Sequence, residues 1–148
     1  MGTTFVSVDG VHGFWMSDGV LELWLRLLSL HVEDPVQSGG EATRIRDQWL
    51  LASRGYFTGS VPHALGEAVA SEVGKKLVVS SVRSLLCALT AAPPRMSADT
   101  LNLLGFSGCW TEDFETGRLI QVGNAFLDLI DGKVTGTAHK TDFMPGCT

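Results

Sequence analysis

Residues 17–33, SDGVLELWLRLLSLHVE, decide the fold of this chain. The polar positions of this stretch recur at helical spacing and form one narrow stripe, which consists of Glu22, Arg26, Ser29 and Glu33. Almost every other position is apolar, so the helix that this pattern predicts must be covered on most of its sides. We therefore expect a central helix over residues 17–33 with one thin edge in solvent. Glu22 and Arg26 lie one turn apart and are expected to form a local ion pair of small energetic weight.

Five further helical patterns follow along the chain. They cover about residues 38–53, 60–73, 75–92 and 97–105, and a last long pattern ends at Gly132. Their predicted N-terminal caps are Ser38 (in a capping box with Glu41), Ser60, Ser97, and either Thr111 or Asp113. Gly74 leaves open whether the patterns on either side of it form one helix or two.

The N-terminal residues favour β structure. Residues 3–15 read TTFVSV-DG-VHGFW, and Asp9-Gly10 between β-prone runs predicts a short hairpin with a tight turn. The alternative is an extended segment that packs Phe5 and Val8 onto the helices. The tail 133–148 has no helical period and contributes at most one strand, beside the hairpin. The expected fold is mainly α, a single domain over residues 1–148, with five or six helices packed around the 17–33 helix.

Composition limits the class of partner. The chain has 148 residues, 45% hydrophobic and 18% charged, which is typical of a compact domain. The formal net charge is -5, and the 11 Lys and Arg residues are scattered, which argues against direct nucleic-acid binding and favours a basic partner.

The same features bear on location. The 17–33 helix is too short and too charged to span a membrane, and the N-terminus lacks the pattern of a secretory signal. The three cysteines form no CxxC pair, and Cys87, inside an apolar helical run, is expected to be a buried free thiol. A cytoplasmic protein without disulfides is therefore expected.

Signatures of catalysis are weak. Residues 105–109, GFSGC, resemble a nucleophile elbow, but Cys109 stands where the elbow has its last glycine, and a predicted helix rather than a strand precedes it. A small hydrolase that uses Ser107 and His139 remains the alternative function. The four histidines lie far apart in the sequence and have no metal-ligand spacing, so neither a metal nor a cofactor is expected.

Aromatic residues fall in connecting segments rather than on helical faces, at Phe14-Trp15, Tyr56-Phe57 and Trp110, and the densest cluster of charge is Glu112, Asp113 and Glu115. Either these aromatics close the core, or they are exposed anchors of an interface. One of the acids is also a candidate cap for the last helix. The candidate partner-binding residues are Tyr56, Phe57, Trp110, Glu112, Asp113 and Glu115.

In size, acidity and lack of an enzymatic signature, the chain resembles bacterial immunity proteins, the small cytoplasmic inhibitors of toxins. The phrases that carry the resemblance are GFWMSDGVLELWLRLL (13–28), IRDQWLLASRGYF (45–57) and DFETGRLIQVGNAFLDLIDGKV (113–134). Immunity proteins share no single fold, so the resemblance implies no architecture. It implies a non-enzymatic binding module that neutralises a cognate toxin by occluding it, and an acidic surface suits the basic groove of a nuclease toxin.

Overall fold

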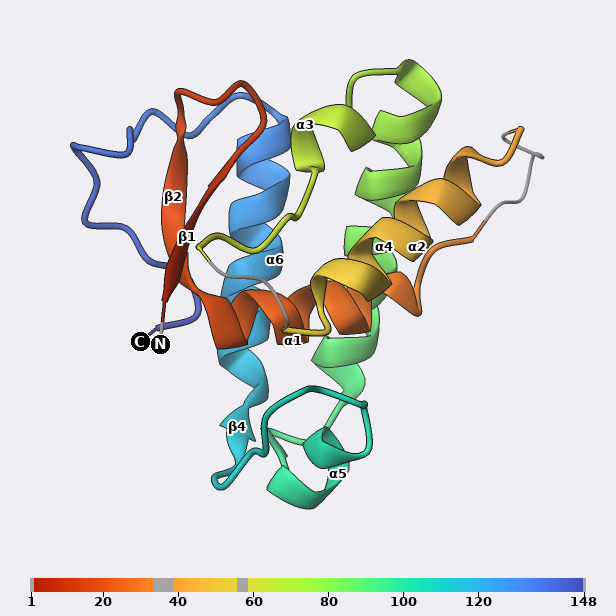
Figure 1. The fold of residues 1–148 in the computed structure, drawn as a ribbon, viewed down its shortest axis with the longest axis vertical. Coiled ribbons are helices and arrows are strands. Elements are labelled where there is room, and N and C mark those ends of the chain that lie inside the picture. Colours follow the sequence, from red (N-terminus) through yellow and green to blue (C-terminus); the bar gives the residue numbers. More distant parts are fainter. Residues whose placement is uncertain (1, 34–38, 56–58, 148) are drawn as a thin grey trace.

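The computed structural model describes residues 2–33, 39–55 and 59–147 of the chain (Figure 1). In these ranges the helices are α1 (Asp18–Ser29), α2 (Glu41–Ala52), α3 (Leu65–Ala68), α4 (Glu72–Ala91), α5 (Ala98–Asn102) and α6 (Thr116–Ile130). The strands are β1 (Thr3–Ser7), β2 (Gly13–Ser17), β3 (Arg95–Met96) and β4 (Phe114–Glu115). The mainly helical fold with an N-terminal hairpin is confirmed. The second sheet, β3–β4, was not predicted.

Helix α1 is the central element, as the sequence predicts. It packs against α2, α4 and the hairpin, and it crosses α4 and α6 where these two helices lie side by side (Figure 1). The ring of Trp24 lies 5.4 Å from that of Phe126 in α6. Leu21, Leu23 and Leu25 are fully buried with Trp24. Since burying one large apolar side chain contributes about 1.5–3 kcal/mol, this helix carries a large share of the core energy.

The polar stripe of α1 differs from the expectation. The helix ends at Ser29, and Ser29 is buried and donates a hydrogen bond of 2.6 Å to the carbonyl oxygen of Arg26. Glu22 and Arg26 are half-buried, and none of the ion pairs among the described residues joins them. The predicted thin solvent edge is therefore wrong, because segments distant in sequence cover it.

The starts of α2 and α3 also differ. The N-cap of α2 is Gly40, at φ 89°, rather than Ser38, which lies outside the described residues. Helix α3 covers only residues 65–68, so Ser60 and Pro62 precede it instead of opening it. The predicted caps were misplaced because Ser and Pro favour helix starts and turns alike.

The predicted N-cap of α5 is confirmed, whereas the predicted N-caps of α6 are wrong. Ser97 caps α5 as predicted, since its Oγ accepts a hydrogen bond of 3.2 Å from the Thr100 amide. Helix α6 begins at Thr116 with Glu115 as its N-cap, so neither Thr111 nor Asp113 caps it. The strand β4, residues 114–115, separates Thr111 and Asp113 from the start of α6.

The hairpin is confirmed, but its turn is longer than a two-residue turn. Strands β1 and β2 pair from Thr3 opposite Ser17 to Ser7 opposite Gly13, which leaves residues 8–12 as the loop. The Asp9 carboxylate accepts hydrogen bonds of 2.8 Å from the amides of Val11 and His12. Together with the side chain of His12, these bonds lower the pKa of Asp9.

The C-terminal tail lies beside the hairpin, as expected. The Gly13 amide donates to the Gly136 carbonyl at 2.8 Å, and Trp15 Nε1 donates to the Ala138 carbonyl at 3.1 Å. The described part of the tail forms isolated bridges rather than a full strand. Phe14, expected in a connecting segment, is a fully buried residue of β2.

Cys87 is exposed, so the expectation of a buried thiol is wrong. It faces outward from α4, next to the buried positions Leu85 and Leu89. An apolar run does not place every one of its residues on the buried face of the helix, and Cys87 lies off the face that holds Leu85 and Leu89. Within the described ranges, no helix has both the length and the apolar character that crossing a bilayer requires.

Gly74 lies inside α4, which begins at Glu72 after the cap Ser71. A Cβ atom at Gly74 would clash with the carbonyl oxygen of Ala68 and would lie 2.7 Å from Glu41 Oε1. We expect Gly74→Ala to destabilise the domain by about 1–3 kcal/mol, although the same change inside a helix ordinarily stabilises by about 1 kcal/mol.

Gly117 of α6 is the matched control for Gly74, because a Cβ atom there meets nothing within 4 Å. We expect Gly117→Ala to be neutral or to stabilise by up to about 1 kcal/mol. Urea unfolding at neutral pH measures both variants. Stabilisation by Gly74→Ala would contradict the close approach of α3 to α4.

Candidate functional site

Four of the six predicted binding residues lie in one surface segment, residues 103–115, which follows α5 and leads into α6 (Figure 1). These are Trp110, Glu112, Asp113 and Glu115. The other two, Tyr56 and Phe57, lie outside the described residues. Their neighbour Gly55 contacts the segment, since Ser107 Oγ donates to the Gly55 carbonyl oxygen at 3.5 Å.

Side-chain hydrogen bonds join the 103–115 segment to both ends of α5. Asn102 at the end of α5 pairs with the backbone of Trp110 in both directions: Nδ2 donates to the carbonyl at 2.9 Å, and Oδ1 accepts from the amide at 2.7 Å. The Asp113 carboxylate accepts from the Ala98 amide at 3.0 Å, at the start of α5. The segment is therefore preorganised, which lowers the entropic cost of binding.

Arg26 ties this segment to the central helix. Its Nε donates to Ser53 Oγ at 2.7 Å, its Nη1 donates to the Leu104 carbonyl oxygen, and its guanidinium lies 5.3 Å from the ring centre of Phe106. Burial lowers the pKa of Arg26, and the nearby charge of Arg54 adds to this effect. One side chain on α1 thus fixes both the end of α2 and the loop after α5.

Three aromatic rings form a row along the segment. The Trp110 ring lies 6.3 Å from Phe106 and 5.6 Å from Phe114, in edge-to-face arrangements. Phe114 is buried and the other two are half-buried. The guanidinium of Arg118 lies 4.3 Å from the centre of the Phe114 ring. Trp110 therefore combines both expected roles, since it covers the core while part of its surface remains accessible.

The three acidic residues have different environments. Asp113 is engaged by the Ala98 amide, and Glu115 lies 3.6 Å from Arg95. Glu112 is exposed and takes part in none of the ion pairs among the described residues. Arg95 and Arg118 line the same shallow hollow of about 590 Å³ as the three acids. The acidity of the cluster is thus partly offset, and Glu112 is its freest carboxylate.

A second hollow, of about 470 Å³, separates the segment from the start of α1. Its walls include Phe106 and Trp110 on one side and Glu22 on the other, with Glu112 and Arg118 also lining it. Burial raises the pKa of Glu22, and the neighbouring Asp18 raises it further. Sequence reasoning placed Glu22 in a local pair with Arg26 and missed its position at this hollow.

Leu103 is the most exposed large apolar side chain among the described residues, at 86%. It was also missed, although the spacing contained the signal. The helical spacing puts Leu101 and Leu104 on one apolar face, so Leu103 must point elsewhere. In the structure Leu101 is buried in α5, and Leu104, after the end of the helix, is partly buried. Leu103 stands at the start of the segment, as the C-cap of α5.

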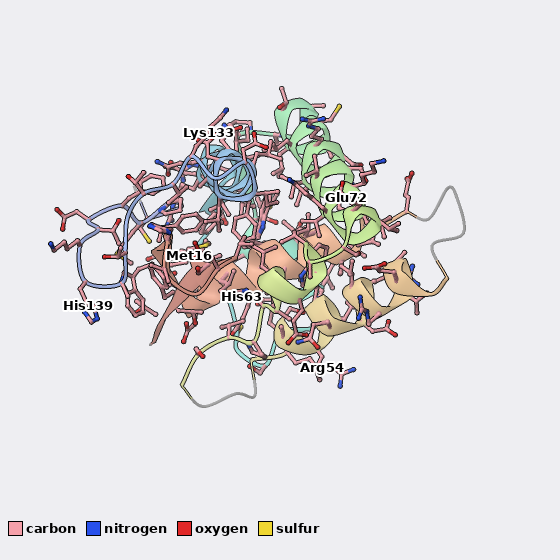
Figure 2. All side chains as sticks on the ribbon, turned by 90° about the horizontal axis from the view of Figure 1, so that it is seen from above. Met16, Arg54, His63, Glu72, Lys133 and His139 are labelled. Carbon is pink, nitrogen blue, oxygen red and sulfur yellow. The ribbon has the colours of Figure 1, made fainter. Side chains whose placement is uncertain are left out.

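The residues of the alternative hydrolase are not brought together. Ser107 lies in the loop after α5, whereas His139 lies at the outer edge of the tail beside the hairpin (Figures 1 and 2). Within the described ranges, no group of three His, Cys, Asp or Glu side chains is placed to hold a metal ion. Comparison with protein-family models, with curated proteins and with solved structures finds no match for this chain.

Proposed function

We propose that this chain is a non-enzymatic protein-binding module that docks a basic protein partner through the 103–115 segment. The observation that carries the proposal is Leu103, 86% exposed at the start of the segment that also holds the aromatic row of Phe106, Trp110 and Phe114. An exposed apolar side chain on a preorganised surface is typical of an interface anchor, because its burial supplies binding energy without a cost for ordering the loop.

The charges of the surface support a basic partner. Glu112 is free, Glu115 is paired only at the exposed surface with Arg95, and the chain as a whole carries a formal net charge of -5. Carboxylates on the same segment as an exposed apolar side chain steer a positively charged partner and speed its association. We propose that this module is an immunity protein, which occludes the basic groove of a bacterial toxin such as a nuclease.

The test is association with the product of the adjacent gene. Both proteins are purified and the affinity is measured by calorimetry at two salt concentrations. Leu103→Ser is expected to weaken binding by about tenfold, because the proposal makes Leu103 a central anchor, and truncating an anchor of this kind costs about 1–2 kcal/mol. Glu112→Lys should weaken binding further and reduce its dependence on salt.

Val73→Ser is the matched control, because Val73 is also an exposed apolar residue (47%) but lies at the opposite end of α4 from α5. It should leave the affinity unchanged. If Leu103→Ser and Glu112→Lys bind as tightly as the unmodified protein, the 103–115 segment is not the binding surface. A neighbouring product that does not bind at all would contradict the immunity role.

A further inference from the structure

We propose that the hollow between α1 and the 103–115 segment receives an arginine side chain of the partner, with the guanidinium against Trp110 and between the carboxylates of Glu22 and Glu112. This inference rests on the proposed function and names the chemical group that the surface recognises. The hollow, the rings and the charges each support it.

The aromatic row already binds guanidinium groups of the chain itself. Arg26 lies over Phe106 at 5.3 Å, and Arg118 lies over Phe114 at 4.3 Å. Trp110 stands between these two rings, and within the described ranges no guanidinium lies over it. Tryptophan is the best of the aromatic side chains for a cation, so the middle ring of the row is the one left available to a partner.

The carboxylates complement such a group. Glu22 and Glu112 line the same hollow as Trp110, and no described residue forms an ion pair with either. A planar guanidinium can donate to carboxylates while it stacks on a ring, which the compact ammonium of lysine does less well. Arg118 lines the hollow too, but its guanidinium lies over Phe114 and its Nε donates to the Gly146 carbonyl at 2.6 Å.

The size of the hollow agrees with this occupant. About 470 Å³ is ample for one long side chain and its water shell, whereas the hollow is open rather than an enclosed pocket for a cofactor. Half-buried Glu22 lies one turn before Arg26 on α1, so the hollow has a rigid wall on the side of the central helix.

The experiment uses a small probe and the intact protein. N-acetyl-arginine methylamide is titrated into ¹⁵N-labelled protein, with the citrulline and lysine derivatives as matched ligands. We expect the arginine derivative to shift the Trp110 indole signal and the backbone amide signals of other residues that line the hollow, such as Val20 and Gly108, in a saturable way; the amide signals measure binding in every variant. The citrulline derivative, which is neutral and nearly the same shape, should bind at least about fivefold more weakly, and the lysine derivative more weakly than arginine.

Two variants locate the site. Trp110→Leu should weaken binding of the arginine derivative by about three- to thirtyfold, and Glu112→Gln by up to about fivefold. Glu112 is exposed, so its variant keeps the fold even if Trp110→Leu loosens the segment. Glu67→Gln, an exposed acid on α3, is the control and should bind as the unmodified protein does.

Equal binding of the arginine and citrulline derivatives would overturn the inference, as would unchanged binding by both Trp110→Leu and Glu112→Gln. Lysine binding as tightly as arginine would overturn the choice of a guanidinium. The proposed function fails separately. If Leu103→Ser loses the partner but the unmodified protein does not bind the arginine derivative, only this inference is removed. If the protein binds the arginine derivative but not the product of the adjacent gene, only the proposed function is removed.

Discussion

Leu25→Asp is expected to abolish the cooperative fold of the domain. Leu25 is fully buried on α1, where this helix meets the rest of the core. Removing a buried leucine side chain costs about 2–5 kcal/mol. The new carboxyl group has no partner there, so burial raises its pKa far above its usual value. Keeping it protonated at neutral pH costs about 1.4 kcal/mol for each pH unit between its ordinary pKa of about 3.9 and pH 7, which is about 4 kcal/mol. Together these costs reach the whole stability of an ordinary domain, about 5–15 kcal/mol.

Circular dichroism on heating and the dispersion of amide NMR signals measure this loss. The matched control is Leu25→Met, which keeps the volume and apolar character and should cost less than about 1.5 kcal/mol. A Leu25→Asp protein that melts cooperatively near the temperature of the unmodified chain would show that α1 is not the central helix.

Arg26→Ala is expected to destabilise the domain by about 2–4 kcal/mol and to loosen the 103–115 segment. A hydrogen bond from a charged donor contributes about 1.5–3 kcal/mol, and a cation–π contact such as the one with Phe106 contributes about 0.5–2 kcal/mol. Part of this loss is offset, because the variant no longer has to bury a charged group. The change removes the donors to Ser53 and to the Leu104 carbonyl oxygen. The helical spacing alone predicts that Arg26 contributes only a few tenths of a kcal/mol to stability, through a local pair with Glu22.

Urea unfolding measures the stability, and hydrogen exchange of the amides of residues 104–110 measures the loosening. Arg54→Ala is the control, because Arg54 is exposed and points away from the molecule (Figure 2). It should change the stability by less than about 0.5 kcal/mol. Arg26→Lys should restore only part of the loss, since one ammonium cannot reproduce the fork of donors. An Arg26→Ala protein as stable as Arg54→Ala would contradict the tether.

The candidate site could be predicted only in part. Local composition pointed to Trp110 and the acids of residues 112–115, because loops rich in aromatic and charged residues are common binding surfaces. It could not separate Asp113, which accepts from the Ala98 amide, from Glu112, which is free. That difference arises from residues 15 positions apart that the fold brings together.

The sequence by itself determined the helical class, the central position of α1, the hairpin around Asp9 and the cap of α5 at Ser97. These features depend on spacing and local hydrogen bonds, which residues within a turn or two of one another decide. Only the tertiary structure decided what covers the polar side of α1. The helical spacing predicts Arg26 and Glu22 as a solvent-facing pair. In the fold, Arg26 donates to Ser53 after α2 and to the Leu104 carbonyl oxygen after α5, and Glu22 lines the hollow beside the 103–115 segment. Which side chains share a surface depends on packing between distant segments, and the helical spacing of the sequence does not determine that packing.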